Sequence, residues 1–287
     1  MNQETLERLA SGSGLVRRVI WLDETDSTQD ELRRRAAAGR DEGGLLVAAG
    51  RQTAGRGRRG RAWFSPAGQG LWFSLLFTPP GPRTAWPFVT ALAALGLRRA
   101  LEEASGVSPR LKWPNDLLYE GRKLAGILAE TVARSVALGI GVNLAQVRED
   151  FPGELRELAV SVRMAAGRSP EPEQVLGLFL RTFEALLERF GREGAAPFRA
   201  DLRSASVLLG RMVWLSDGRS GRVIDLGEAG ELILEMDGGA EGASAERAAG
   251  AARPSLEPAD GRARPAGARR SFSIASGEIE RIEPPLR

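Results

Sequence analysis

LKWPNDLLYEGRKLAGILAE, residues 111–130, contains two apolar runs separated by a Glu-Gly-Arg tripeptide. Short apolar runs joined by a glycine-containing turn are typical of a β-hairpin. The pattern predicts strands over 116–119 and 123–130. A proline disfavours helical backbone at the residue before it, so Trp113 should be extended. Lys123 would then stand near the end of a buried strand with its ammonium group directed at a site.

Several polar residues in and near this stretch are of types that the chain rarely uses. The chain has only five lysines and asparagines: Lys112, Lys123, Asn2, Asn115 and Asn143. Four of these five fall within 32 consecutive residues. A lysine is a compact point charge that reaches a single oxygen, whereas arginine is a planar fork. We interpret the four as a polar constellation that serves a functional site.

A second distinctive stretch is GRQTAGRGRRGRAWFSP, residues 50–66, which follows a predicted strand over 44–49. Its glycines allow a close backbone approach, so that successive N–H groups can hold an anion, and its arginines add bidentate contacts. The neighbouring aromatics also suit a nucleic-acid strand. Taken alone, the loop fits three surroundings equally: a nucleic-acid backbone, the phosphates of one nucleotide, or solvent.

The remaining elements follow from apolar periodicity and from capping residues. Asp26-Ser27-Thr28 is typical of a helix N-terminus, and that helix should run to about residue 38. Further elements are expected as strands over 16–22, 70–77 and 134–144 and helices over 84–105 and 172–191. After about residue 206, short apolar runs broken by Asp-Gly turns predict a small antiparallel sheet or barrel, and strand character resumes over 272–282. Residues 239–270 are rich in Ala, Gly, Arg and Pro and predict a disordered insertion.

Composition removes several classes of function. The chain has no cysteine and no histidine, which excludes disulfides, thiolate metal sites and imidazole catalysis. The formal net charge is only +3, less than a general nucleic-acid binder usually carries. No run of 18 apolar residues occurs, and the N-terminus lacks the apolar core of a signal peptide. We expect a cytoplasmic protein with no membrane partner.

Four motifs, DST, GRQTAGRGRRGRAWFSP, KWPNDLLYEGRKLAGILAE and GIGVNLA, occur in one order over residues 18–205. In sequence and spacing they resemble the biotin protein ligase family, also called biotin–[acetyl-CoA-carboxylase] ligases. The resemblance implies an α+β catalytic domain at 1–205, in which helices flank a mixed β-sheet as in class II synthetases. A small SH3-like β-barrel at 206–287 would follow and would contain the insertion at 239–270.

The resemblance also implies a reaction in two steps. Family members activate biotin with ATP and magnesium to biotinyl-5′-AMP and pyrophosphate. They then transfer biotin to one lysine of a biotin carboxyl carrier protein, part of acetyl-CoA carboxylase or another biotin-dependent carboxylase. The family includes monomers and homodimers, and the motifs do not identify magnesium ligands. About two dozen residues precede DST, too few for the N-terminal DNA-binding module of some members, so we expect a monofunctional ligase without a DNA partner.

Site residues carry over from the family motifs by position. Those expected to contact biotin are Ser27, Thr28, Gln29 and Gln52, although the family often has asparagine where Gln29 stands. The loop expected to close over biotin and the adenylate contains Arg56, Gly57 and Arg58. Lys123 matches the lysine that contacts carboxyl and phosphoryl oxygens. Residues expected to line the same region are Trp63, Asn115, Asp116 and Asn143.

Roles follow from the chemistry of these side chains. Lys123 and Arg58 would neutralise the two anions that meet when a carboxylate attacks the α-phosphate. We hypothesise that Asp116 orients or deprotonates the acceptor lysine. The apolar strand over 70–77 would form a wall for the valerate chain of biotin. Three further arginines of the loop are expected to face solvent or pyrophosphate: Arg51, Arg59 and Arg61.

The alternative from another class is a nucleic-acid-binding protein that uses the Arg/Gly loop and the basic insertion. The small net charge, the lack of aromatic residues in the insertion and the order of the four motifs favour the enzyme.

Overall fold

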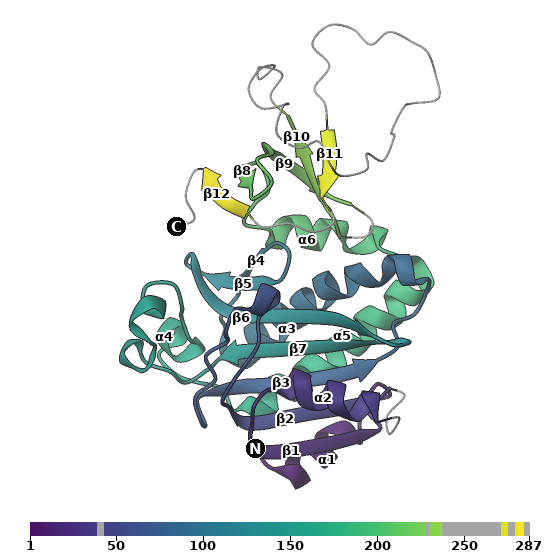
Figure 1. The fold of residues 1–287 in the computed structure, drawn as a ribbon, viewed down its shortest axis with the longest axis vertical. Coiled ribbons are helices and arrows are strands. Elements are labelled where there is room, and N and C mark those ends of the chain that lie inside the picture. Colours follow the sequence, from purple (N-terminus) through teal and green to yellow (C-terminus); the bar gives the residue numbers. More distant parts are fainter. Residues whose placement is uncertain (39–42, 228–229, 237–270, 275–278, 284–287) are drawn as a thin grey trace, which may run out of the picture.

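A seven-stranded mixed β-sheet forms the centre of the molecule (Figure 1). The computed structural model describes residues 1–38, 43–227, 230–236, 271–274 and 279–283. The strands lie in the order β1-β2-β3-β7-β6-β5-β4; β1 and β2 are parallel and every other neighbouring pair is antiparallel. Their bounds are β1 Arg18–Thr25, β2 Leu45–Gln52, β3 Gly70–Phe77, β4 Arg110–Lys112, β5 Asp116–Tyr119, β6 Arg122–Val132 and β7 Ser135–Asn143.

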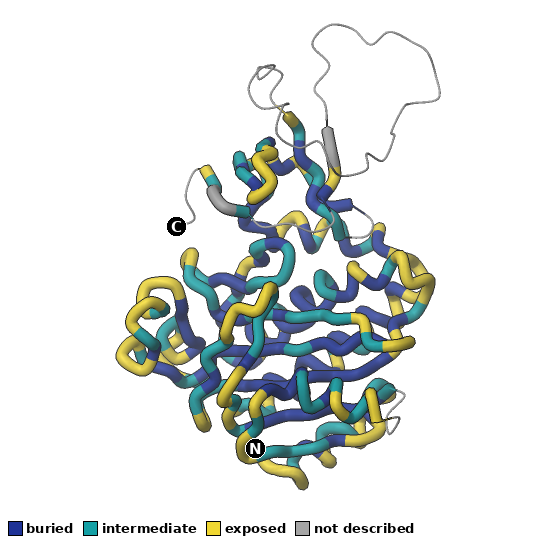
Figure 2. The backbone as a smooth tube through the Cα atoms, viewed as in Figure 1, coloured by how far each residue is buried: buried dark blue, intermediate teal, exposed yellow. Residues whose placement is uncertain are grey.

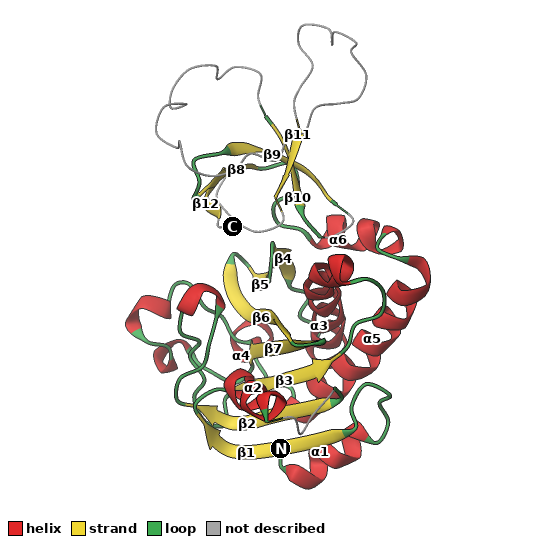
Figure 3. Ribbon diagram, turned by 45° about the vertical axis from the view of Figure 1, so that its right-hand side comes forward, coloured by secondary structure: helices red, strands yellow, loops and turns green. Residues whose placement is uncertain are grey.

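Helices cover both faces of this sheet (Figure 3). The longer ones, α3 (Val89–Ser105) and α5 (Pro172–Glu193), pack against each other on one face, and α2 (Thr28–Ala37) covers part of the other. The remaining helices are α1 Gln3–Ala10, α4 Val162–Ala166 and α6 Arg199–Ala205, with 3-10 turns at Arg58–Gly60, Arg83–Phe88, Arg148–Asp150, Gly153–Leu155 and Ala196–Phe198. The two-sided cover explains why the central strands are apolar along their whole length.

The core lies between the sheet and the α3–α5 pair, where Figure 2 shows almost continuous burial. Aromatic rings join the layers: Phe73 of β3 lies 5.5 Å from Phe179 of α5, and Phe179 stacks on Phe183 at 5.1 Å. A smaller cluster on the other face packs Leu32 of α2 against Val47 and Leu76. The continuous apolar run predicted as a buried strand over 70–77 is therefore confirmed.

A second sheet follows at the C-terminal end, with strand order β11-β10-β9-β8-β12 and all pairs antiparallel. Its strands are β8 Met212–Leu215, β9 Ser220–Leu226, β10 Leu232–Glu235, β11 Ser271–Ile274 and β12 Ile279–Glu283. It adjoins the first unit through Asp225, which pairs with Arg199 and Arg203 at 3.0 and 3.1 Å. The predicted fold class, an α+β catalytic unit followed by a small SH3-like antiparallel unit, is confirmed; the limit at residue 205 stays a prediction.

Two predicted elements differ from the structure. The helix expected over 84–105 is a 3-10 turn at Arg83–Phe88 followed by α3, because Pro87 cannot donate the backbone hydrogen bond of a regular helix. The strand character expected over 272–282 is found in two separate strands: β11 pairs with β10 and β12 with β8, at opposite edges of the small sheet. The insertion predicted at 239–270 lies outside the described residues.

Within the described part of the chain, no helix combines the length and apolar character needed to cross a membrane.

The aromatic contacts between β3 and α5 give the fold a direct test. We expect Phe179→Ala to lower the free energy of unfolding by about 3–5 kcal/mol, because it leaves a cavity between two packed layers. Urea denaturation measures this value. Leu158→Ala is the matched control, since that side chain is 64% exposed and its removal should change stability by less than about 0.5 kcal/mol. Equal effects of the two substitutions would contradict this assignment of the core.

Candidate active site

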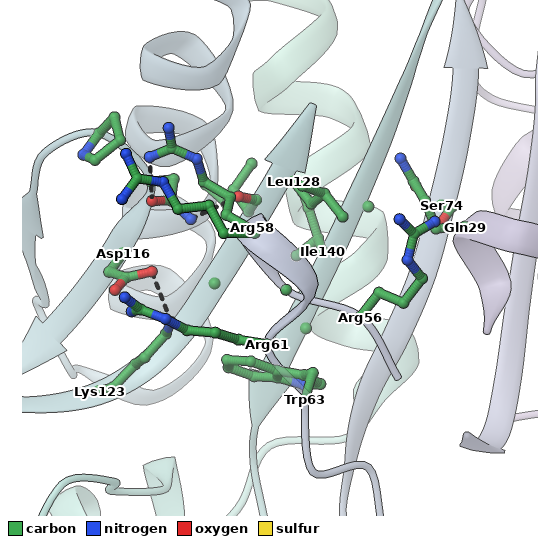
Figure 4. Close-up of a pocket in the computed structure, with 18 of the residues that line it drawn as sticks. Gln29, Arg56, Arg58, Arg61, Trp63, Ser74, Asp116, Lys123, Leu128 and Ile140 are labelled. Carbon is green, nitrogen blue, oxygen red and sulfur yellow. Dashed lines mark hydrogen bonds and ion pairs between the residues drawn. The ribbon is translucent and has the colours of Figure 1, made fainter. Parts of the chain in front are cut away.

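A cavity opens on the face of the seven-stranded sheet that also carries α2 (Figure 4). The start of α2, the Arg/Gly loop, the segment between β4 and β5, and strands β3, β6 and β7 all contribute to its walls. Figure 4 shows three zones along it: Gln29, Ser74 and Arg56 at one end, Leu128 and Ile140 in the middle, and Asp116 with Lys123 at the other. Its chemistry therefore changes from polar, with one arginine that is paired with Asp30, to apolar and then to charged.

The polar end is built on the N-terminus of α2. Ser27 is the N-cap of this helix, as predicted, and its hydroxyl accepts from the Asp30 N–H at 3.4 Å. The Thr28 hydroxyl donates to Gln52 Oε1 at 3.1 Å and lies 2.9 Å from the Ser74 hydroxyl. The backbone N–H of Thr28 also donates to Gln52 Oε1, at 2.8 Å. Capping and cavity lining thus coexist in these residues.

Gln52 lines the cavity, but its amide is engaged by the protein. Besides accepting from Thr28, it donates from Nε2 to the Ser65 hydroxyl at 2.8 Å. These bonds tie the first turn of α2 to the segment that follows the Arg/Gly loop. Gln52 therefore fixes the position of Thr28 relative to Ser65, a structural role that the sequence did not predict.

The middle of the cavity has room for the Trp63 ring because β6 and β7 carry glycines there. A Cβ on Gly141 would lie 2.4 Å from Trp63 Nε1, and one on Gly126 would lie 3.0 Å from the same indole. Gly139 and Gly141 are two residues apart and so share one face of β7. The indole of Trp63 rests where side chains at 126 and 141 would otherwise be, edge-on to Trp72 at 6.4 Å.

The predicted apolar wall is therefore on different strands. We expected 70–77 to supply it, but of β3 only Ser74 lines the cavity. Phe73 faces α5, and Trp72 is fully buried beneath Trp63. The apolar lining comes instead from β6 and β7: Leu128 lies on the same face as the glycines, and Ile127 and Ile140 border the cavity from the core side.

Lysine and arginine side chains gather at the charged end. Lys123 Nζ lies 2.8 Å from Asp116 Oδ1 and 5.1 Å from the centre of the Trp63 ring, a cation–π arrangement. Arg58 donates to Asn115 Oδ1 at 3.4 Å, and Asn115 in turn donates to the backbone carbonyl of Ile127 at 2.9 Å. Lys112 also lines this end, so both lysines of the chain face one cavity.

Main-chain bonds fix the position of Lys123. Its N–H donates to the Leu158 carbonyl at 2.7 Å, and its carbonyl accepts from the Val160 N–H at 3.0 Å. Asn143 is buried and does not line the cavity, contrary to expectation; its Nδ2 donates to the carbonyls of Lys123 and Val160 at 3.3 and 3.2 Å. This asparagine holds two segments together behind the lysine.

The Arg/Gly loop folds back over the cavity. The Gly57 N–H donates to the Arg61 carbonyl at 2.7 Å and so closes a tight turn. Four of its arginines line the cavity: Arg56, Arg58, Arg59 and Arg61. Arg59 and Arg61 are exposed at the edge of the cavity, in keeping with the expected solvent-facing arginines, and a place on the pyrophosphate side stays a prediction. Arg51 pairs with Glu24 at 2.8 Å outside the cavity.

Local electrostatics follow from burial and from pairing. Burial lowers the pKa of Arg58, and the neighbouring charges of Arg59 and Arg61 lower it further, while Asp116 opposes the shift. An arginine nonetheless stays charged at neutral pH, so this end of the cavity attracts anions. A bidentate pair with Arg34 lowers the pKa of the Asp26 carboxyl well below its usual range.

Among the described residues, no group of three acidic side chains is arranged to hold a metal ion. Within the described part of the cavity lining, Asp116 is the one carboxylate, and it is paired with Lys123. The protein side of this site is therefore suited to anions rather than to a resident divalent cation.

Comparisons with known proteins agree with this geometry. Residues 21–146 match the model of the biotin/lipoate A/B protein ligase family. The chain is 37% identical to the bifunctional ligase/repressor BirA of Bacillus subtilis, over 77% of this chain and 70% of that protein. It is 34% identical to the biotin–[acetyl-CoA-carboxylase] ligase of Mycobacterium tuberculosis, over 80% and 87%. The solved structure of the Aquifex aeolicus biotin protein ligase with biotin and ATP has a TM-score of 0.70 and 27% identity, covering 92% of this chain and 97% of that one.

The seat of Trp63 can be tested without any ligand. We expect Gly141→Ala to displace the indole and to lower the free energy of unfolding by about 1–3 kcal/mol, as overpacked sites do. Of the indole N–H signals in an NMR spectrum, the one lost in Trp63→Phe should move. Gly153→Ala is the control, because nothing lies within 4 Å of a Cβ there. An unmoved Trp63 signal in Gly141→Ala would show that the glycine is not needed to seat the ring.

Proposed function

The chain belongs to the biotin protein ligase family, and we propose that the cavity described above performs both steps of the family's reaction. The protein activates biotin with ATP to biotinyl-5′-AMP. The observation that carries the assignment of the site is the order of its three zones. Biotin has a ureido ring, an apolar valerate chain and a carboxylate in the same order, so one orientation satisfies every zone.

At the polar end, the ureido ring offers one carbonyl acceptor and two N–H donors. The Thr28 hydroxyl donates to Gln52 and shares a hydrogen bond with the Ser74 hydroxyl, so both oxygens keep lone pairs for a ring N–H, and Gln29 presents an amide oxygen. For the ring carbonyl, one of these hydroxyls would turn its proton from its present partner to the ligand. The valerate chain would then lie along Leu128 and Ile140. These contacts place the carboxylate at the end where Lys123 stands.

Activation joins two anions. A carboxylate oxygen of biotin attacks the α-phosphorus of ATP, a new O–P bond forms, and the bond to the β-phosphate bridging oxygen breaks to release pyrophosphate. Lys123 and the arginines of the loop, Arg58 foremost, lower the repulsion and stabilise the charge that develops on phosphorus oxygens. The enzyme needs no covalent nucleophile, which fits a chain without cysteine or histidine. We propose that magnesium enters with the phosphates of ATP rather than on a protein site.

The second step transfers biotin from biotinyl-5′-AMP, a mixed anhydride of a carboxylic acid and a phosphate, to the carrier lysine. The amine of the acceptor lysine attacks the carbonyl carbon of biotin, the acyl–phosphate bond breaks, and AMP leaves. Asp116 lies at this point and is proposed to accept the proton that the amine must lose once Lys123 turns to the phosphate. The proposed acceptor is a biotin carboxyl carrier protein, in keeping with the ligase from Mycobacterium tuberculosis.

The placement of the Arg/Gly loop argues against the nucleic-acid alternative. Arg56 and Arg58 are half-buried in the cavity, Arg59 and Arg61 are exposed at its edge, and Arg51 is paired with Glu24. A loop that binds an external polymer would present all of these charges on an open surface.

The proposal predicts that removing the charge of Lys123 blocks the first step. Lys123→Ala should slow biotin-dependent ATP–pyrophosphate exchange by about 100-fold or more, the size expected for loss of a transition-state charge contact. Arg51→Ala is the control, because it removes a cation that lies outside the cavity. If the unaltered protein fails to biotinylate a carrier domain, the proposed function is wrong. If Lys123→Ala retains full exchange, only the role of this lysine is wrong.

A separate prediction concerns Asp116. Asp116→Asn should slow transfer from biotinyl-5′-AMP to a carrier lysine by about 100-fold, the lower bound for general-base catalysis, and slow adenylate formation much less. Single-turnover assays of the two half-reactions measure both rates. The transfer defect should shrink as pH rises toward the pKa of a free lysine, about 10.4, because the amine then deprotonates without help. Equal slowing of both steps would contradict this role.

A further inference from the structure

Glu130 of β6 makes three polar contacts at the border of the cavity without belonging to its lining. Its Oε2 accepts from Gln29 Nε2 at 3.1 Å and from Arg33 at 3.3 Å, while its Oε1 lies 3.7 Å from Arg56. The side chain is 29% exposed, so these contacts form where solvent screens them only in part. Neither activation nor transfer, as proposed, uses this carboxylate.

The contact with Gln29 fixes which way that amide points. Gln29 is 3% exposed, and its Nε2 donates both to Glu130 and to the backbone carbonyl of Ala137, the latter at 3.0 Å. Both partners can only accept hydrogen bonds. A flipped amide would place its own oxygen against two acceptors and leave a buried N–H₂ group to find new partners. The amide oxygen must therefore face the other way.

That oxygen is the atom presented at the polar end of the cavity. Gln29 lines the cavity, and among the described residues its buried Oε1 has no hydrogen-bond partner. A Cβ on Gly139 would lie 2.7 Å from this oxygen. Gly139 thus leaves room for Gln29 Oε1, and a ligand N–H group would supply the hydrogen bond that this buried oxygen lacks.

Two arginines hold Glu130 in this position. Arg33 lies 3.3 Å from it and also 3.6 Å from Asp30, and Arg56 lies 2.6 Å from the same Asp30. The four side chains form an alternating cluster of two carboxylates and two guanidinium groups. As a carboxylate, Glu130 is a pure acceptor, which a neutral amide in its place would not be.

We propose that Glu130 is the positioning residue that sets the hydrogen-bond polarity of the ureido pocket. By accepting from Gln29 Nε2, it keeps Gln29 Oε1 directed at the ligand as an acceptor for a ring N–H of biotin. This inference rests on the proposed function of the cavity and adds a specificity element to it. Acids that lack an N–H donor at that place would leave a buried acceptor unpaired and bind poorly.

The test is Glu130→Gln, measured by ATP–pyrophosphate exchange beside the unaltered protein. A glutamine can donate as well as accept, so it no longer opposes a flipped Gln29 amide, and the Ala137 carbonyl alone is left to hold the orientation. We expect KM for biotin to rise at least 10-fold while kcat at saturating biotin stays within about 2-fold. Asp30→Asn is the matched control: it removes a charge from the same cluster without touching Gln29, and its effect on KM should be at least three times smaller.

A double substitution separates positioning from general damage. If Glu130 acts through Gln29, then Glu130→Gln should raise KM by less than 2-fold further in a Gln29→Ala background. Gly139→Ala provides a second route, because its Cβ crowds the same oxygen and should also raise KM. Independent, multiplicative effects of the Glu130 and Gln29 substitutions would overturn the inference, as would equal effects of Glu130→Gln and Asp30→Asn. Failure of the unaltered protein to catalyse exchange would instead refute the proposed function.

Discussion

The structure depends on three glycines that leave part of the sheet surface without side chains. Gly126, Gly139 and Gly141 lie side by side on β6 and β7, and two of them are direct partners across the strands. A sheet covered on both faces is normally packed solid. Here the missing Cβ atoms let the Trp63 indole and the Gln29 amide approach the backbone, and the cavity forms between them. The cost is local: these glycines contribute no apolar burial on that face, while the opposite face carries the aromatic core.

The positive charge of the cavity comes largely from the Arg/Gly loop, and nearby carboxylates compensate it. A loop with this many arginines would repel itself if its side chains converged without counter-charges. Asp30, Glu130 and Asp116 stand around the cavity at the positions where Arg56, Arg58 and Lys123 converge. The carboxylates therefore hold the cations apart and in place. When an anionic substrate binds, it could replace these carboxylates as the partner of the cations. The cations are therefore paired in the empty site and still attract the substrate.

Much of this arrangement could be predicted from the sequence. The hairpin around Gly121, the buried strand over 70–77 and the N-cap at Ser27 follow from local rules, and the structure confirms them. The rarity of lysine in the chain is enough to single out Lys123. The glycine surface of the cavity was not predicted. Three glycines in apolar strands do not indicate a cavity until the strand register is known and places them side by side. A Gly-x-Gly pattern inside a strand was the available clue.

Other errors have the same origin in long-range packing. Asn143 belongs to a conspicuous motif, yet it works behind Lys123, because two distant segments needed a buried donor between them. Glu130 ends the stretch 111–130, but nothing in that stretch indicated its role, because its partners come from α2 and from the loop, about 75 to 100 residues earlier in the chain. The apolar wall was assigned to the wrong strand because hydropathy does not tell which face of a buried strand meets a cavity and which meets a helix.

If the cavity works as proposed, biotin binds with its ureido ring at Gln29 and its carboxylate at Lys123. A crystal structure of the full chain with a non-hydrolysable analogue of biotinyl-5′-AMP is the sharpest test of this binding mode. We predict a ring N–H within hydrogen-bond distance of Gln29 Oε1 and a phosphate oxygen within that distance of Lys123 Nζ. A ureido ring bound beside Lys123, or bound outside the cavity, would refute it.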